Sequence, residues 1–146
     1  MVMPVKILDP VEISRFILAP PEVVFDAWVR PELIRKWLFV GPTSEIIDVK
    51  LDLKIQGKFS ILEYEKSTNE QIDHYGKYTE IVRPAKLAFT LSVPKHFPGE
   101  TNVSIEIIAT TGGSVLSLVQ TGVSKDVTEP SWNKMLDQLS LTLENW

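Results

Sequence analysis

The clearest feature of the hydrophobic pattern is that its period changes along the chain. Over residues 11–18, Val11, Ile13 and Ile17 alternate with polar neighbours. A period of two is typical of a strand with one buried face. The first element predicted from the pattern is therefore a half-buried strand.

Two short helices are predicted directly after this strand. Pro20 and Pro21 end the strand, and Pro21 suits the first turn of a helix because its missing N–H would have no partner there. Apolar residues then follow at helical spacing, which predicts a helix over residues 21–29. Pro31 ends this helix and opens a second one, which runs to about Trp37.

From Glu45 onward the alternation returns and is interrupted only by turn residues. Strands are expected near residues 45–54, 57–65, 71–83, 86–93, 101–111 and 114–122. Short connections, such as the glycine pair at 112–113, imply antiparallel neighbours, and with the first strand they predict a seven-stranded sheet. An edge strand such as 101–111 could pair two subunits, so both a monomer and a homodimer fit the pattern.

A long helix is predicted at the C-terminal end. Thr128 can cap it, with Glu129 and Pro130 in the first turn. Apolar residues follow at steps of three and four: Trp132, Met135, Leu136, Leu139, Leu143 and Trp146. They share one face, and a helix of about 17 residues is about 25 Å long, enough to lie across a curved sheet.

Composition narrows the class of protein. With 146 residues, 44% of them apolar, we expect a single globular domain over residues 1–146, with residues 1–10 as an N-terminal extension. The net charge of −4 argues against a nucleic-acid partner, which is held mainly by phosphate neutralisation. The chain has no cysteine, which excludes disulfides, thiolate nucleophiles and zinc sites that depend on sulfur.

Targeting and cofactor motifs are missing from the sequence. The first ten residues do not resemble a secretory signal, and no apolar run approaches the roughly 20 residues of a membrane span. We therefore expect a cytoplasmic protein. The two histidines have no metal-ligand spacing and no serine lies in a nucleophile elbow, so no metal, no other cofactor and no catalytic residue is predicted.

Short motifs narrow the fold further. They are Arg15–Pro20, Val24–Trp28, Pro31, Trp37, Pro42, Gly57–Phe59, Gly76–Ile81, Pro84, Leu87 and Thr121–Gly122. With the order of elements, they resemble the AHSA-type family of the START-like, Bet v 1-like (SRPBCC) superfamily over residues 11–146. This family contains homologues of the domain that activates the ATPase of heat-shock protein 90. The resemblance implies an α+β helix-grip fold, in which a curved antiparallel sheet wraps the C-terminal helix.

Three positions depart from the family pattern. Gln56 stands where members often have the first of two glycines, and we expect it to keep ordinary β dihedrals, since only glycine is comfortable at positive φ. Leu38 replaces a second aromatic residue after the tryptophan, and Ser131 replaces a glycine before Trp132. Leu38 changes what the mouth of a pocket can stack against.

Aromatic residues suggest a function, but two interpretations stay open. They could line a ligand cavity between the sheet and the last helix, or they could fill the core. The resemblance favours the cavity, because this fold tends to be hollow. The candidate ligand-binding residues are Trp28, Trp37, Phe39, Tyr64, Tyr75, Phe89, Trp132 and Leu136. The leading hypothesis is a module that binds a small apolar, lipid-like or aromatic molecule.

Two alternatives follow from the same resemblance. One is a protein that contacts a chaperone, as the activator of heat-shock protein 90 does, although that activator joins this domain to a second one. The other is an enzyme similar to polyketide cyclases or hydrolases. The enzyme would need His74, Tyr64, Tyr75 or an inward glutamate to converge on one point.

Polar residues on the predicted strands test these alternatives. Strand parity turns Asp73 away from His74, so the neighbouring strand, with Glu63 or Glu65, offers the nearer partner. We expect a structural or solvated histidine, and the same holds for His96, which lies in a loop between two prolines. Three further residues could orient a ligand if they are buried: Arg15, Glu106 and Gln120.

Overall fold

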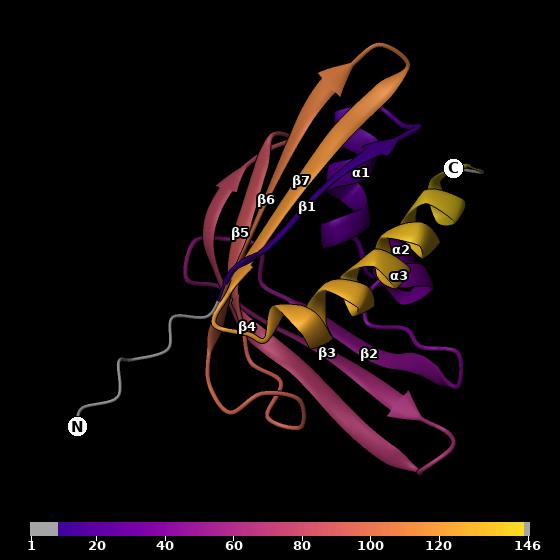
Figure 1. Cartoon of the computed structure of the whole chain (residues 1–146), viewed down its shortest axis with the longest axis vertical. Helices are drawn as coiled ribbons and strands as arrows, with labels where there is room; N and C mark the ends of the chain where they lie inside the picture. Colours follow the sequence, from indigo (N-terminus) through magenta and orange to yellow (C-terminus); the bar gives the residue numbers. More distant parts are fainter. Residues whose placement is uncertain (1–8, 145–146) are drawn as a thin grey trace.

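The protein is described by a computed structural model that covers residues 9–144, in which a bent sheet faces three helices (Figure 1). The elements in chain order are β1 (Val11–Ile17), α1 (Pro21–Val29), α2 (Pro31–Trp37), β2 (Ser44–Leu51), β3 (Lys58–Glu65), β4 (Glu70–Val82), β5 (Lys86–Leu91), β6 (Thr101–Thr110), β7 (Gly113–Thr121) and α3 (Lys125–Glu144). This is the predicted order. Most of the expected N-terminal extension lies outside the described residues.

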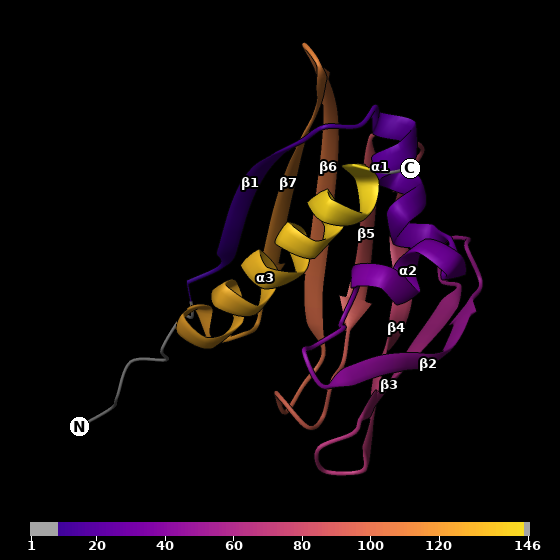
Figure 2. The ribbon, with the colours of Figure 1, turned by 90° about the vertical axis from the view of Figure 1, so that its right-hand side faces the viewer.

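The strands form one antiparallel sheet of seven. Their spatial order is β1-β7-β6-β5-β4-β3-β2. The sheet bends so that β2 and β3 turn away from β1, β6 and β7, and all three helices lie on its concave side (Figures 1 and 2). Helix α3 crosses that side obliquely (Figure 2). The α+β helix-grip fold is therefore confirmed.

The position of β6 corrects one prediction. Residues 101–111 were expected to be an edge strand, whereas β6 lies between β5 and β7 and pairs with both. The edges are β1 and β2. Alternation shows which face of a strand is buried but not which strands are neighbours. Here β7 covers the outer side of β6, and β1 returns to pair with β7, with Val11 opposite Gln120, so that β1 forms this edge of the sheet.

Prolines set the bounds of the first two helices. Pro21 occupies the first turn of α1, and α1 ends at Val29 because the next residue, Arg30, takes an extended conformation before Pro31. The helices then pack on each other: the Trp37 indole N–H donates to the Ala27 carbonyl at 2.9 Å, in the core. Both helix predictions are confirmed at their bounds.

Helix α3 begins one turn earlier than predicted. Thr128 is not its cap, because the Thr128 N–H donates to the Ser124 carbonyl at 3.0 Å and α3 starts at Lys125. Pro130 lies inside the helix near its N-terminal end, where its missing N–H leaves one carbonyl without an intrahelical donor. The predicted stripe is confirmed for its buried members Trp132, Leu136, Leu139 and Leu143; Met135 is half-buried, and Trp146 lies outside the described residues.

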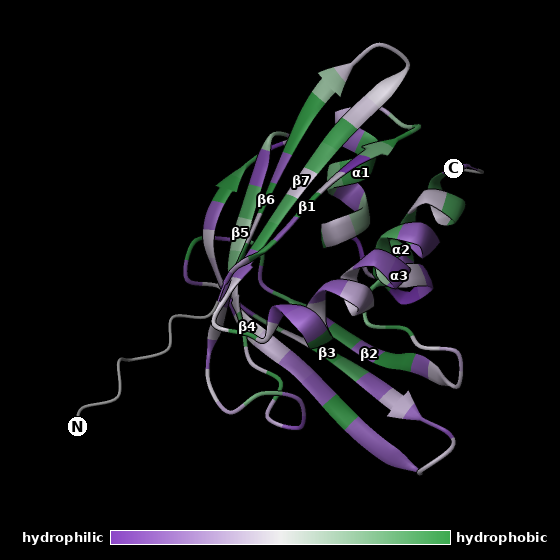
Figure 3. Cartoon of the chain, in the orientation of Figure 1, coloured by the Kyte–Doolittle hydropathy of each residue, from purple (hydrophilic) through white to green (hydrophobic). Residues whose placement is uncertain are grey.

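The sheet buries its concave face. On β6, Val103, Ile105 and Ile107 are almost fully buried, and the alternate residues face outward. Figure 3 shows hydrophobic segments along β1, β6 and β7, while the hairpin end of β3 and β4 is mostly hydrophilic. The core therefore lies beneath the helices at the β1, β6 and β7 side, and the β3–β4 side is more polar.

The turn before β3 contradicts the expectation for Gln56. This residue has φ = 66°, in the left-handed region, and its N–H donates to the Tyr78 carbonyl at 2.7 Å. Gly57 follows with no room for a side chain, since a Cβ there would lie 1.9 Å from the Asp52 carbonyl oxygen. The tight turn imposes the left-handed conformation on residue 56 whatever its side chain, so Gln56 is strained.

Candidate ligand pocket

A pocket of about 430 Å³ opens between the first half of α3, the β5–β6 loop and the concave face of β3 and β4. Its apolar wall is formed by Phe39, Val40, Pro42, Leu91, Val93, Phe97, Val127, Trp132 and Met135. Its polar side chains are Glu63, His74, His96, Gln120, Thr128, Ser131 and Lys134. An apolar wall with a few placed polar groups is typical of small-molecule sites.

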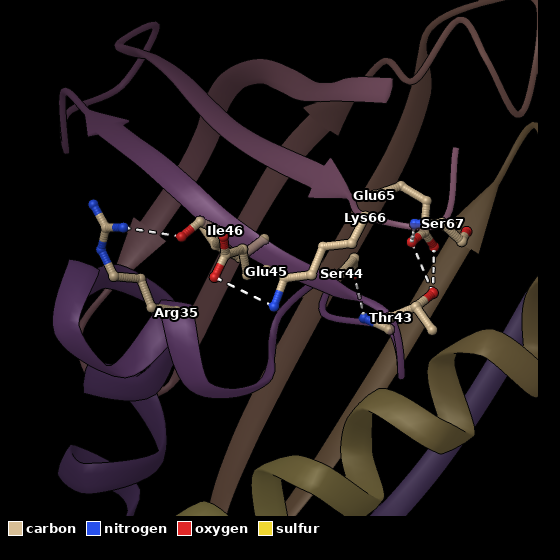
Figure 4. Close-up of polar contacts among 9 residues, drawn as sticks. Arg35, Thr43, Ser44, Glu45, Ile46, Glu65, Lys66 and Ser67 are labelled. Atoms are coloured by element: carbon tan, nitrogen blue, oxygen red, sulfur yellow. Dashed lines mark hydrogen bonds and ion pairs between the residues drawn. The ribbon is translucent and has the colours of Figure 1, made fainter. Parts of the chain in front are cut away.

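One wall comes from the loop between α2 and β2, which several hydrogen bonds hold in place. Residues 39–42 line the pocket. The Gly41 N–H donates to Ser44 Oγ at 2.7 Å. Thr43 Oγ1 donates to the Glu65 carboxylate, whose two oxygens lie 2.7 and 2.9 Å away (Figure 4). The loop is thereby tied to the ends of β2 and β3, and this wall is preformed.

Phe39 occupies the centre of that wall in a strained conformation. Its φ of 62° lies in the left-handed region, which is unusual for a bulky side chain. The Phe39 N–H points to the Met135 sulfur at 3.2 Å, and the ring stacks on His74 with centroids 4.0 Å apart and planes at 7°. These contacts offset a backbone cost of about 1–2 kcal/mol.

His74 and Glu63 form a buried pair on the concave face. His74 Nε2 lies 2.9 Å from Glu63 Oε1, and the two residues are 4% and 9% exposed. His74 is opposite Ile61 in the β3–β4 register, so Glu63, two residues further, points to the same face. Asp73 faces the other way and accepts a hydrogen bond from Ser60 Oγ at 2.6 Å. The expected partner on the neighbouring strand is therefore the one observed.

Electrostatics fix the charge of Glu63 in this pair. Burial raises the pKa of Glu63, but hydrogen bonds from His74 and Ser44 outweigh that effect, so the pKa lies below its usual value. The carboxylate is thus ionised at neutral pH and can only accept hydrogen bonds. Burial also lowers the pKa of His96, with the neighbouring His74 acting in the same direction.

A second polar chain crosses the floor of the pocket. The Trp132 indole N–H donates to Gln120 Oε1 at 2.7 Å, and Gln120 Nε2 donates to Thr101 Oγ1 at 3.0 Å. Thr101 Oγ1 then donates to the Leu91 carbonyl at 2.8 Å. This chain fixes the orientation of the Trp132 ring against β7 and confirms that Gln120 is a buried polar residue.

The other two polar candidates do not reach the pocket. Arg15 lies half-buried under α3, where it pairs with Asp137 and donates to Asn133 Oδ1 at 3.1 Å. Glu106 is exposed on the outer face of β6, 3.9 Å from Lys86 Nζ. Arg15 therefore ties the edge strand β1 to α3, and Glu106 is a surface residue.

The predicted ligand-binding residues fall into three groups. Phe39 and Trp132 line the pocket. Trp28 and Phe89 border a separate void of only about 10 Å³, and Trp37 and Leu136 are completely buried in the core. Tyr64 bonds to Asn69 at the surface, and Tyr75 is 41% exposed, so neither lines the pocket. The aromatic core is filled, and the open space lies beside it.

Sequence reasoning missed part of the pocket, including its histidine wall. His96 was expected to be a solvated or structural residue without a functional role; it is half-buried, lines the pocket, and its ring lies 6.5 Å from that of His74. The acid–base set required for an enzyme is divided, since His74 meets Glu63 whereas Tyr64 and Tyr75 lie elsewhere. Period-two parity could have placed Glu63 and His74 on one face; no sequence signal places the β5–β6 loop over them.

Neither a metal cluster nor a membrane helix is found within residues 9–144. No three His, Asp or Glu side chains there come together as metal ligands would. None of the helices in the same range has the length and apolar character needed to cross a membrane.

The geometry defines a helix-grip protein with an open pocket under its C-terminal helix. The model of the family "Activator of Hsp90 ATPase homolog 1-like protein" matches residues 18–144, and the chain belongs to this family. No curated protein matches the chain.

Solved structures share the fold at low sequence identity. Protein CV1439 from Chromobacterium violaceum is 23% identical, with a TM-score of 0.83, covering 92% of this chain and 96% of its own. The AHSA1-like protein from Aeromonas hydrophila is 19% identical, with a TM-score of 0.82 and coverage of 94% and 93%. Protein SA2116 from Staphylococcus aureus, described as of unknown function, is 18% identical, with a TM-score of 0.81 and coverage of 94% of both chains. These likenesses concern the fold alone.

Proposed function

We propose that the protein binds a small, largely apolar molecule in the pocket beneath the first half of α3. The observation that carries this proposal is an open pocket of about 430 Å³ beside a filled core. A site of this size with apolar walls suits a drug-sized or metabolite-sized ligand. Phe39 and Trp132 supply aromatic contact, and Met135 supplies an adaptable wall.

The test is to fill the pocket from its rim. Ser131 is exposed on α3 and lines the pocket, so Ser131→Phe should obstruct it without disturbing the core. Gln138→Phe places the same ring at an exposed position further along α3, outside the pocket, and serves as the control. Binding of the fluorescent probe 1-anilinonaphthalene-8-sulfonate should weaken at least tenfold in Ser131→Phe and stay unchanged in Gln138→Phe. Equal binding by all three proteins would refute the proposal.

A second candidate function is contact with heat-shock protein 90, which the family name suggests. An exposed apolar row on the convex face favours it: Phe16 on β1 and Ile108 on β6 both lie opposite Val115 on β7. Phe16 is 50% exposed and Ile108 is 61% exposed. Contiguous exposed apolar side chains are typical of protein-binding surfaces.

This candidate is tested separately from the pocket. Calorimetric titration of purified heat-shock protein 90 should show binding that Ile108→Asp weakens and Ser131→Phe leaves unchanged. The convex face and the pocket lie on opposite sides of the sheet, so the two variants separate the two functions. No heat of binding with the wild-type chain would remove the chaperone candidate.

A further inference from the structure

The buried ring of His74 contains an unused hydrogen-bonding atom. Within residues 9–144, His74 Nδ1 has no hydrogen-bond partner and no solvent contact. An unsatisfied buried polar atom costs about 1–3 kcal/mol, so such atoms are rare in folded proteins and call for an explanation. His74 itself lines the pocket, so the closed atom belongs to a residue that a ligand in the pocket would contact.

Glu63 determines what kind of partner that atom needs. An ionised carboxylate only accepts, so His74 Nε2 carries the proton that it donates across 2.9 Å to Glu63. In the neutral ring, Nδ1 is then a bare acceptor. In this tautomer the pair presents an acceptor, which suits a ligand group that donates a hydrogen bond.

The surroundings restrict the remainder of the ligand. Phe39 covers one face of the imidazole, so a hydrogen bond to Nδ1 has to form in the plane of the ring. Because water does not reach Nδ1, a ligand must displace a neighbouring side chain. Phe39 is stacked on His74 and held at its N–H by Met135, whereas the neighbouring His96 is half-buried on the β5–β6 loop.

We propose that the pocket selects an apolar, flat ligand that carries a hydroxyl group, of the phenol or enol type, and that this hydroxyl donates its proton to His74 Nδ1. This inference rests on the proposed function and adds the chemical class of the ligand. Glu63 is the positioning residue, because it holds the ring in the tautomer that accepts. The apolar body contacts Phe39 and Trp132.

The experiment uses two probes that differ in one group. 2-Naphthol can donate a hydrogen bond, whereas 2-methoxynaphthalene has the same ring system and can only accept. Calorimetric titration of the full chain should show 2-naphthol binding about tenfold more tightly, the value of one good hydrogen bond. Equal affinity for the two probes would overturn the inference and leave the proposed function standing. Failure of both probes to bind would overturn both.

Two further measurements isolate Glu63 and His74. In Glu63→Gln, the amide can donate a hydrogen bond to Nε2, so that Nδ1 can carry the proton of the ring. The ratio of the affinity for 2-naphthol to that for 2-methoxynaphthalene should then fall toward one. Glu12→Gln, an exposed change on β1, is the matched control and should keep the preference. In the unsubstituted protein, the ¹⁵N chemical shift of His74 Nδ1 should change when 2-naphthol is added. It should stay the same when 2-methoxynaphthalene is added. An unmoved resonance would contradict the inference.

Discussion

The ring of Phe39 lies almost parallel to the imidazole of His74, with centroids 4.0 Å apart and planes at 7°. Phe39 belongs to the loop after α2, and His74 belongs to β4. The contact therefore joins the preformed wall of the pocket to the buried His74–Glu63 pair. It also stabilises a backbone conformation, φ = 62°, that a phenylalanine rarely adopts.

Phe39→Ala and Phe39→Gly separate these two effects. Alanine removes the ring but keeps the left-handed strain, and we expect it to lower the free energy of unfolding by about 1–3 kcal/mol for this half-buried ring. Glycine relieves the strain, so Phe39→Gly should be more stable than Phe39→Ala by about 1 kcal/mol. Urea denaturation measures both. A glycine variant less stable than the alanine variant would mean that residue 39 is not strained.

Acidification should destabilise the protein partly through Glu63. Its folded-state pKa lies below the ordinary 4.5, so the stabilisation is fully present above pH 4.5 and is lost as the pH falls through the folded-state value. Glu63→Gln should lower stability at pH 7 and show a smaller further loss between pH 4.5 and pH 3. His96, whose pKa is also lowered, acts in a higher range, below pH 6.5.

Urea midpoints measured from pH 7 to pH 3 test this prediction. Glu12→Gln is again the control, because it removes a carboxylate from the exposed side of β1. Parallel curves for the wild type and Glu63→Gln below pH 4.5 would show that Glu63 does not contribute the acid sensitivity.

Gln56→Gly should stabilise the protein. Gln56 has φ = 66°, and glycine adopts this conformation without the Cβ penalty of about 1–2 kcal/mol. The greater flexibility of glycine in the unfolded chain offsets part of the gain, so we expect about 0.5–1 kcal/mol in thermal or urea denaturation. Gly57→Ala, next to it, should be strongly destabilising because its Cβ would meet the Asp52 carbonyl oxygen. A destabilised Gln56→Gly variant would contradict this account of the turn.

Gln120→Leu should cost about 1–3 kcal/mol, because it leaves the buried Trp132 indole N–H without its acceptor at 2.7 Å. The leucine has a similar size, so the effect reports the lost hydrogen bonds rather than a cavity. Gln71→Leu, at an exposed position on β4, should change stability by less than about 0.5 kcal/mol. Denaturation followed by tryptophan fluorescence compares the two variants, and equal stabilities would refute a structural role for the Gln120 chain.

Local patterns predicted most of the fold. Prolines at 21 and 31 set the first two helices, and alternation marked the strands, because these signals act within a few residues. The position of β6 in the sheet and the start of α3 were wrong. Periodicity does not show which strands pair, and here β6 lies between β5 and β7 while β1 forms the edge beside β7. The earlier start of α3 is a local feature, in which the Thr128 N–H already donates to the Ser124 carbonyl.

The pocket was predicted less completely than the fold. Phe39 and Trp132 line it as expected, whereas most of the other aromatic candidates fill the core or face the surface. Apolar character alone does not separate a wall from a core. The Glu63–His74 pair follows from strand parity once the β3–β4 register is known, and His96 depends on the path of the β5–β6 loop.

The most direct test of the central claim is native mass spectrometry of the freshly purified chain and of Ser131→Phe, each compared with its denatured mass. We expect the wild type either to carry a small molecule that is lost on unfolding or to take up 2-naphthol at one equivalent, and Ser131→Phe to do neither. A wild-type mass equal to that of the chain, unchanged after incubation with 2-naphthol, fatty acids and sterols, would contradict it.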